Sequence, residues 1–290
     1  MHHRFPWLVL ILAGVASAQP QPIRIGGPPK IAVIDVYGQH RIPADRVVKA
    51  LGLKVGDPLP ASKLDLEDKL EAISGIVRSH TEAVCCAPAG AVLYLGIEER
   101  GVPGFQFRPP ATGIELPLPA KDDLAGLRKA VREADSASVR ADAALLLGEL
   151  LGTAEAVDDL QFAAQDSDPT VRQAAVRSLV RHSINPLLKV EPTWMIEMLN
   201  SVVFTDRKIA VDALMELTER PEPVLYGKIR ERGLESLVQM AQFQHLPDAL
   251  PSYLLLCRVS GVSKDEAEAT WTAGQRAATI VKILKGPKKK

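Results

Sequence analysis

The sequence predicts a small α+β domain followed by an all-α solenoid, and two patterns indicate this division. Between residues 23 and 108, apolar runs of strand length and short amphipathic helices follow one another in the order β-α-α-β-β, which predicts a three-stranded sheet with two helices. From residue 121 to 285, apolar residues recur at helical spacing and one short segment occurs in three copies. We therefore expect two structural units, joined by residues 109–120.

The helical repeat is clearest when its arginines are aligned. Arg140 in the first copy corresponds to Arg172 in the second, 32 residues later, and to Arg207 in the third, a further 35 residues on. In the second copy Asp168 is expected to cap a helix that starts at Pro169. Another amphipathic helix precedes each copy, so the sequence predicts helical hairpins that must stack to bury their apolar faces.

The pattern D-x-D-P-x-V-R-x-A-A of the second copy resembles the short HEAT-like repeats of bacterial proteins. A periodic residue serves a periodic structure, so we expect Arg140, Arg172 and Arg207 to bond loop carboxylates or carbonyls between successive repeats. The alternative is a row of arginines that binds a ligand. A degenerate fourth helix pair is expected over 222–242 and 246–259, and a long last helix over 263–284.

The N-terminal unit is expected to contain a strand at 31–36, helices at 44–51 and 62–77, and a hairpin of strands at 81–87 and 91–98. The phrase IAVIDVYGQHRIPADRVVKALGLKVGDPL and the closing VLYLGIEERG resemble the POTRA (polypeptide-transport-associated) domain. The resemblance implies a module that binds polypeptides in the cell envelope, with an exposed edge strand that accepts an extended partner strand. That edge would be the strand containing Val84, Cys85 and Cys86. The alternative is an edge that the domain's own loops cover.

The chain begins MHHRFPWLVLILAGVASAQP, in which a basic start, an apolar run and the A-x-A ending predict a signal peptide over residues 1–18, cleaved after Ala18. An uncleaved amphipathic anchor is the alternative. The apolar run is shorter than a membrane span, so we expect no membrane-spanning segment in the mature chain. The proline-rich segment 109–120 predicts an extended linker lying against the first helices, and residues 286–290 a solvated basic tail.

Composition and motifs favour a binding protein over an enzyme. The chain has 35 basic and 35 acidic residues, so its net charge favours neither nucleic acid nor an acidic membrane surface. It contains no G-x-S-x-G, H-E-x-x-H, P-loop, G-x-G-x-x-G or C-x-x-C motif. We therefore expect no catalytic residues, no cofactor and no metal. The cysteines Cys85, Cys86 and Cys257 are expected to be small buried apolar residues, and at most one of the first two could pair with the third.

These features together predict an exported, non-enzymatic adaptor in the periplasm, whose POTRA-like domain and HEAT-like solenoid each bind a protein partner. A structural component of an outer-membrane assembly or secretion complex is the first alternative. The second is an enzyme, such as a lyase like those HEAT-like repeat proteins that attach bilins.

Overall fold

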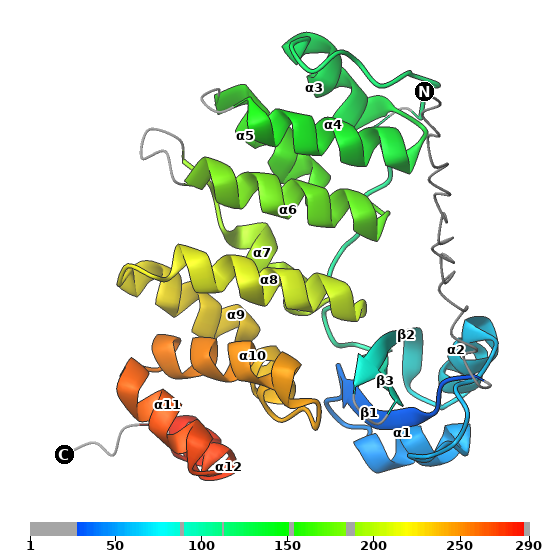
Figure 1. Ribbon diagram of the computed structural model, residues 1–290, viewed down its shortest axis with the longest axis vertical. Coiled ribbons are helices and arrows are strands. Elements are labelled where there is room, and N and C mark those ends of the chain that lie inside the picture. The colour runs from blue at the N-terminus through cyan, green and yellow to red at the C-terminus, as the bar shows by residue number, and fades with distance from the viewer. Residues whose placement is uncertain (1–27, 88–89, 112, 151–153, 184–188, 287–290) are drawn as a thin grey trace, which may run out of the picture.

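The computed structural model describes residues 28–87, 90–111, 113–150, 154–183 and 189–286 (Figure 1). The predicted signal peptide, the tail beyond residue 286 and the side chain of Cys86 lie outside this description. The N-terminal unit consists of β1 (Ile31–Tyr37), α1 (Ala44–Leu51), α2 (Lys63–Glu71), β2 (Ile76–Ala87) and β3 (Gly90–Glu99).

The predicted three-stranded sheet with two helices is confirmed. β1 pairs in parallel with β3, and β2 pairs antiparallel to β3, which gives the strand order β1-β3-β2. One predicted boundary is wrong, because α2 ends at Glu71 and β2 begins at Ile76. Gly75 lies between them with φ 104°, a left-handed conformation that lets the chain turn into the strand.

Both faces of the sheet are buried, each against a different set of helices. Ile34, Leu93 and Leu95 belong to a core that they share with α1 and α2. Tyr37 and Tyr94 point to the other face, since successive side chains of a strand alternate. They belong to the larger core, which continues into the helical region.

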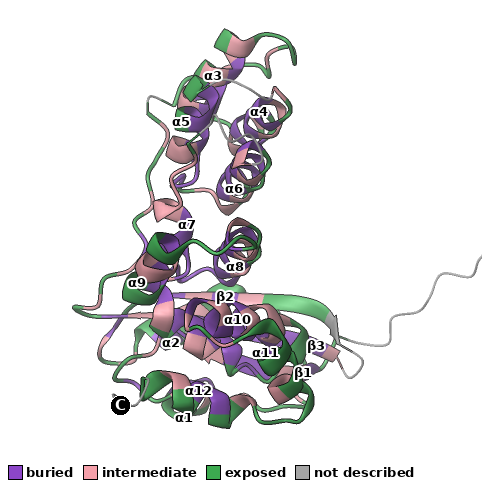
Figure 2. Cartoon of the chain, turned by 90° about the vertical axis from the view of Figure 1, so that its left-hand side faces the viewer, coloured by how far each residue is buried: buried purple, intermediate pink, exposed green. Residues whose placement is uncertain are grey.

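The helical region is a succession of helical hairpins. Their helices are α3 (Leu124–Glu133), α4 (Ala137–Glu149), α5 (Ala154–Ala163), α6 (Pro169–Ser183), α7 (Thr193–Met198), α8 (Phe204–Leu217), α9 (Pro223–Ala241) and α10 (Leu246–Val259). α4, α6, α8 and α10 pack on one another in this order, and α3 and α7 pack on α5 and α9 respectively. Buried residues gather where the two rows of helices face each other (Figure 2). The predicted fourth pair corresponds to α9 and α10.

Local signals set the ends of several helices. The carboxylate of Asp168 accepts the backbone N–H groups of Thr170 at 2.7 Å and Val171 at 3.4 Å, as an N-cap residue does. The predicted long last helix is wrong, because the chain forms α11 (Lys264–Thr272) and α12 (Arg276–Leu284). Gly274 lies between them with φ 68°, and this left-handed residue breaks the helix.

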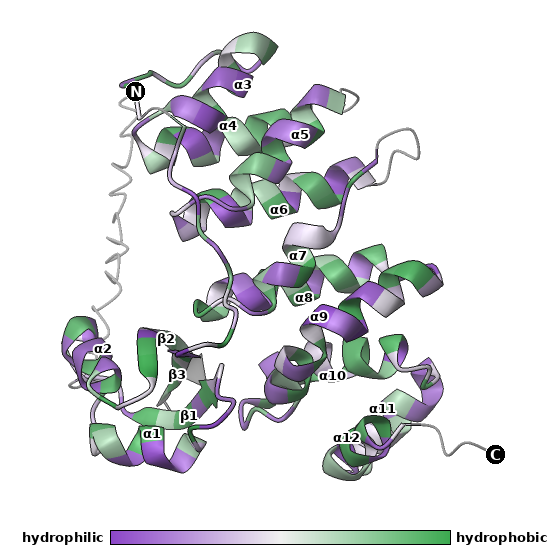
Figure 3. Ribbon diagram, turned by 180° about the vertical axis from the view of Figure 1, so that it is seen from behind, coloured by the Kyte–Doolittle hydropathy of each residue, from purple (hydrophilic) through white to green (hydrophobic). Residues whose placement is uncertain are grey.

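The segment that joins the two units follows the side of the helical hairpins (Figures 1 and 3). Arg108 donates its N–H to the Gln165 carbonyl at 2.6 Å and accepts the Ser167 N–H at 2.7 Å. Further along, Ile114 forms the same kind of bridge with the loop after α3, where its carbonyl accepts the Asp135 N–H at 2.8 Å. Backbone bonds therefore hold this segment, while the side chains of Ile114 and Leu118 are exposed.

Because this segment runs away from the sheet, the hairpins lead back toward it, and α8 and α9 pack against the open face of the sheet. Tyr94 stacks on Phe204 of α8, with ring centroids 3.6 Å apart and planes 6° apart. The Tyr37 hydroxyl donates to the Val202 carbonyl at 2.8 Å. Gly96 permits this approach, since a Cβ there would collide with the Val202 carbonyl oxygen and the Tyr37 hydroxyl.

Candidate functional site

A cleft of about 710 Å³ lies where the sheet meets the helices. Its sheet side is formed by the turn after β1 and the end of β3, including Gly38 and Glu98. Its helical side is formed by Arg207 of α8 together with residues of α7 and α9, including Glu231 and Arg232. The cleft therefore joins the two units, and the repeated arginine of the third copy lies in its wall. We call it the sheet–helix cleft.

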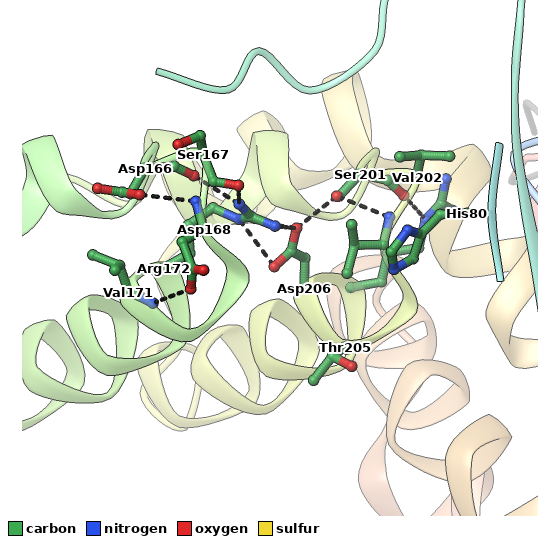
Figure 4. A network of polar contacts seen from close by, with 12 residues as sticks. His80, Asp166, Ser167, Asp168, Val171, Arg172, Ser201, Val202, Thr205 and Asp206 are labelled. Carbon is green, nitrogen blue, oxygen red and sulfur yellow. Dashed lines mark hydrogen bonds and ion pairs between the residues drawn. The ribbon is translucent and has the colours of Figure 1, made fainter. Parts of the chain in front are cut away.

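Two of the three repeated arginines form buried ion pairs from one hairpin to the next. Arg140 bonds Asp166 with Nε at 2.7 Å and Nη2 at 2.9 Å, and Arg172 bonds Asp206 with Nη2 at 2.6 Å (Figure 4). Their Nη1 atoms each donate to two carbonyl oxygens of the loop that precedes their own helix. Every nitrogen of each guanidinium thus donates to an acceptor, an arrangement that the planar arginine fork favours.

Arg207 differs from the other two. Its Nε donates to the Ser201 carbonyl, and its guanidinium lies 4.6 Å from the centre of the Tyr37 ring. Among the described residues no carboxylate oxygen lies within 4 Å of it, and Nη1 is buried without a hydrogen-bond partner. Burial lowers the pKa of Arg207 to about 10, so the side chain stays charged at neutral pH. The wall of the sheet–helix cleft therefore contains an unpaired buried cation.

The two glutamates at the end of β3 have separate roles. Glu99 accepts the backbone N–H groups of His40 at 2.7 Å, Arg41 at 2.9 Å and Ile42 at 2.9 Å. Burial opposes its ionisation, but these three bonds outweigh the burial and hold the pKa of Glu99 below its ordinary value. Glu98 instead has a buried Oε1 with no partner, and burial raises its pKa. Glu99 thus fixes the turn that forms one wall of the cleft.

We expect Glu99→Gln to lower the free energy of unfolding at neutral pH by about 1–3 kcal/mol, because charge-assisted bonds to three amides are weakened. A carboxyl whose folded pKa is depressed stabilises the fold above its unfolded pKa, and this contribution disappears as the pH falls through the folded pKa. The difference in the free energy of unfolding between wild type and variant should therefore disappear below pH 4.5, which is the ordinary pKa of this group. Urea denaturation across the pH range measures it. Glu115→Gln, at an exposed position, is the control and should change the free energy of unfolding by less than about 0.5 kcal/mol.

The predicted partner-binding strand is at an edge of the sheet, and α2 covers its first part. Glu71 accepts the N–H of Ser79 at 2.8 Å, and Glu67 accepts the N–H of Thr81 at 2.7 Å. Glu67 and Glu71 do not cover the strand beyond Thr81, where Val84 is 40% exposed and Cys85 is exposed. The side chain of Cys86 lies outside the described residues.

The cysteine expectation is correct for one residue and wrong for another. Cys257 is a buried free thiol within α10, where it packs as a small apolar residue. Cys85 is exposed on the edge strand and is disulfide-bonded, so it does not pair with Cys257.

Comparison with known proteins found a similarity in the central region. A family model described as HEAT repeats matches residues 124–215, which extend from α3 into α8. This part of the chain is therefore similar to HEAT repeats, and such repeats suggest a role in protein–protein interaction. No curated protein and no solved structure matches the chain. The POTRA resemblance of residues 23–108 is not supported by these comparisons and stays a prediction.

None of the helices in the described part of the chain has the length and apolarity that a membrane span requires. In the same residues, no group of three or more His, Cys, Asp or Glu side chains is placed to hold a metal ion.

Proposed function

We propose that the protein is an exported, non-enzymatic adaptor that binds polypeptide partners in the bacterial cell envelope. The observation that carries the proposal is the HEAT-repeat match over residues 124–215. Stacked helical repeats form extended surfaces on which partner proteins bind. The succession of packed hairpins supports describing the helical region as a solenoid, and the predicted signal peptide supports export.

The second binding surface in this proposal is the uncovered part of the β2 edge. The N–H groups of Ser79 and Thr81 point away from β3 toward α2, so the N–H of Ala83, two residues further on, has the same direction. A partner strand that pairs there would gain main-chain hydrogen bonds, and the exposed Val84 would contribute to selectivity. The POTRA resemblance supports this use of the edge.

A photocrosslinking amino acid at Ala83, introduced into the full chain in intact cells, tests the proposal. We expect it to capture one or a few polypeptides. The same crosslinker at exposed Arg181 of α6 probes the helical surface. Capture at Arg181 alone means that the edge assignment is wrong, and capture at neither position contradicts the adaptor function. A single stoichiometric partner would instead favour the structural component of a larger complex.

We expect Ala83→Pro to lower capture by the edge about ten-fold, because proline lacks the N–H that would bond the partner strand. Proline is tolerated on an edge strand, so the thermal transition should remain close to that of wild type. Ala83→Gly keeps the N–H and is the matched control. Equal capture by the proline and glycine variants would contradict pairing along this edge.

A further inference from the structure

The pairing of the repeated arginines stops at the sheet–helix cleft. Arg140 and Arg172 each hold the aspartate carboxylate of the next hairpin. Arg207, the third in the row, has no such carboxylate among the described residues, although only 2% of the residue is exposed. A buried guanidinium without an anion is costly, and its usual solution is a carboxylate that bonds its free donors.

Three other basic side chains around the cleft have partners, and the carboxylate Glu231 is exposed. Arg232 bonds Glu197 at 3.0 Å, and His40 lies 2.8 Å from Glu235. Arg230 donates to the carbonyl of Val259. The unsatisfied buried polar atoms in the wall are therefore Nη1 of Arg207 on the helical side and Oε1 of Glu98 on the sheet side.

We propose that Arg207 binds a carboxylate of a partner polypeptide in the sheet–helix cleft. The inference rests on the proposed function in that the ligand is a polypeptide. The carboxylate would take the place that Asp166 and Asp206 occupy beside Arg140 and Arg172. A cleft of about 710 Å³ has the volume of a typical ligand site and accommodates a short peptide segment.

The unbonded Oε1 of Glu98 limits the chemistry of the ligand further. It requires a donor close to the carboxylate, and a polypeptide provides one as a backbone N–H. At a chain's C-terminal residue, the carboxylate and the residue's own N–H are attached to the same Cα. An aspartate or glutamate within a partner offers the same two groups with a longer spacing. The shared chemistry is a carboxylate beside an amide N–H, and the ligands in the test separate the two sources.

The test uses random hexapeptides that contain no Asp or Glu and are labelled at the N-terminus with a BODIPY dye that carries no carboxylate. One pool has free C-terminal carboxylates, a second has C-terminal amides, and a third has C-terminal amides with one fixed Asp. In fluorescence anisotropy with the full mature chain, we expect the free-acid pool to bind at least about ten-fold more tightly than the amidated pool. If only the Asp pool binds more tightly than the plain amide pool, the carboxylate comes from a side chain. If both acidic pools do so equally, either source serves, and in both cases the proposal holds. Equal binding of the acid, Asp and plain amide pools, or no binding by any, overturns it.

Variants locate the carboxylate within the cleft. Arg207→Met should abolish the preference for the free acid, whereas Arg177→Met, at an exposed position of α6 outside the cleft, should keep it. Because Arg207 is buried and its loss could unfold the chain, a second variant uses the exposed Glu231. We expect Glu231→Trp to obstruct the cleft and weaken acid binding about ten-fold, while Glu155→Trp on α5 leaves it unchanged. A preference that survives both Arg207→Met and Glu231→Trp overturns the site.

The two proposals can fail separately. If the Ala83 or Arg181 crosslinker captures polypeptides while the peptide pools show no preference for a carboxylate, the adaptor function stands and the Arg207 site is wrong. If neither crosslinker captures a protein, the adaptor function is wrong, whatever the pools show.

Discussion

We expect Arg172→Met to lower the free energy of unfolding by about 3–5 kcal/mol, because removing one partner of a buried ion pair leaves the other charge uncompensated. Asp206 is 0% exposed and receives bonds from Nε and Nη2 of Arg172 at 2.6–3.1 Å. In the variant only the Ser201 hydroxyl, at 2.7 Å, would still bond this carboxylate. The carbonyl oxygens of Asp166 and Ser167 would lose their donor as well.

Urea denaturation followed by circular dichroism measures this loss. Arg177→Met is the matched control, because Arg177 lies on the same helix and is exposed; its effect should stay within about 0.5 kcal/mol. The double variant Arg172→Met, Asp206→Leu should recover part of the loss, since apolar residues of similar volume often replace a buried ion pair at little cost. A single variant within about 1 kcal/mol of wild type would contradict the assigned role of the pair.

Features encoded by neighbouring residues could be predicted from the sequence. The N-cap at Asp168, the hairpins of the central region and the order of strands and helices all follow from periodicity and capping within a few turns of chain. The start of β2 could not be predicted in this way. Its first residues include Arg78 and His80, which are polar and give no strand signal, and pairing with β3 decides their conformation.

The sheet–helix cleft could not be predicted, because its parts are distant in sequence. Nothing near Tyr94 indicates that it faces Phe204 or His245. The lack of an aspartate partner for Arg207 is, however, visible in the sequence. Asp166 follows Arg140 by 26 residues and Asp206 follows Arg172 by 34, whereas residues 233–241, at the same distances after Arg207, contain no aspartate. The one acid in that window, Glu235, bonds His40 instead.

Tyr94 contributes a stacked ring and two hydroxyl contacts to the junction of sheet and helices. We expect Tyr94→Ala to lower the free energy of unfolding by about 3–5 kcal/mol, the usual cost of deleting a fully buried aromatic side chain. The ring is 0% exposed and stacks on Phe204, and its hydroxyl bonds Asp248 and His245. Tyr94→Phe keeps the ring and loses only the hydroxyl, so it should cost about 1–2 kcal/mol.

Leu93→Ala separates loss of docking from loss of stability, because Leu93 is the neighbouring residue of β3 and packs on the opposite face with α1 and α2. Both alanine variants should lower the urea midpoint, but only Tyr94→Ala should open the sheet–helix cleft. Opening would raise the radius of gyration in small-angle scattering and expose residues 100–120 to protease, since that segment connects the two units. If Tyr94→Ala stays as compact and as protease-resistant as Leu93→Ala, the aromatic stack does not hold the sheet on the helices. Hydrogen bonds such as that from the Gly38 N–H to the Gln239 side chain, at 2.9 Å, must then hold the two units together.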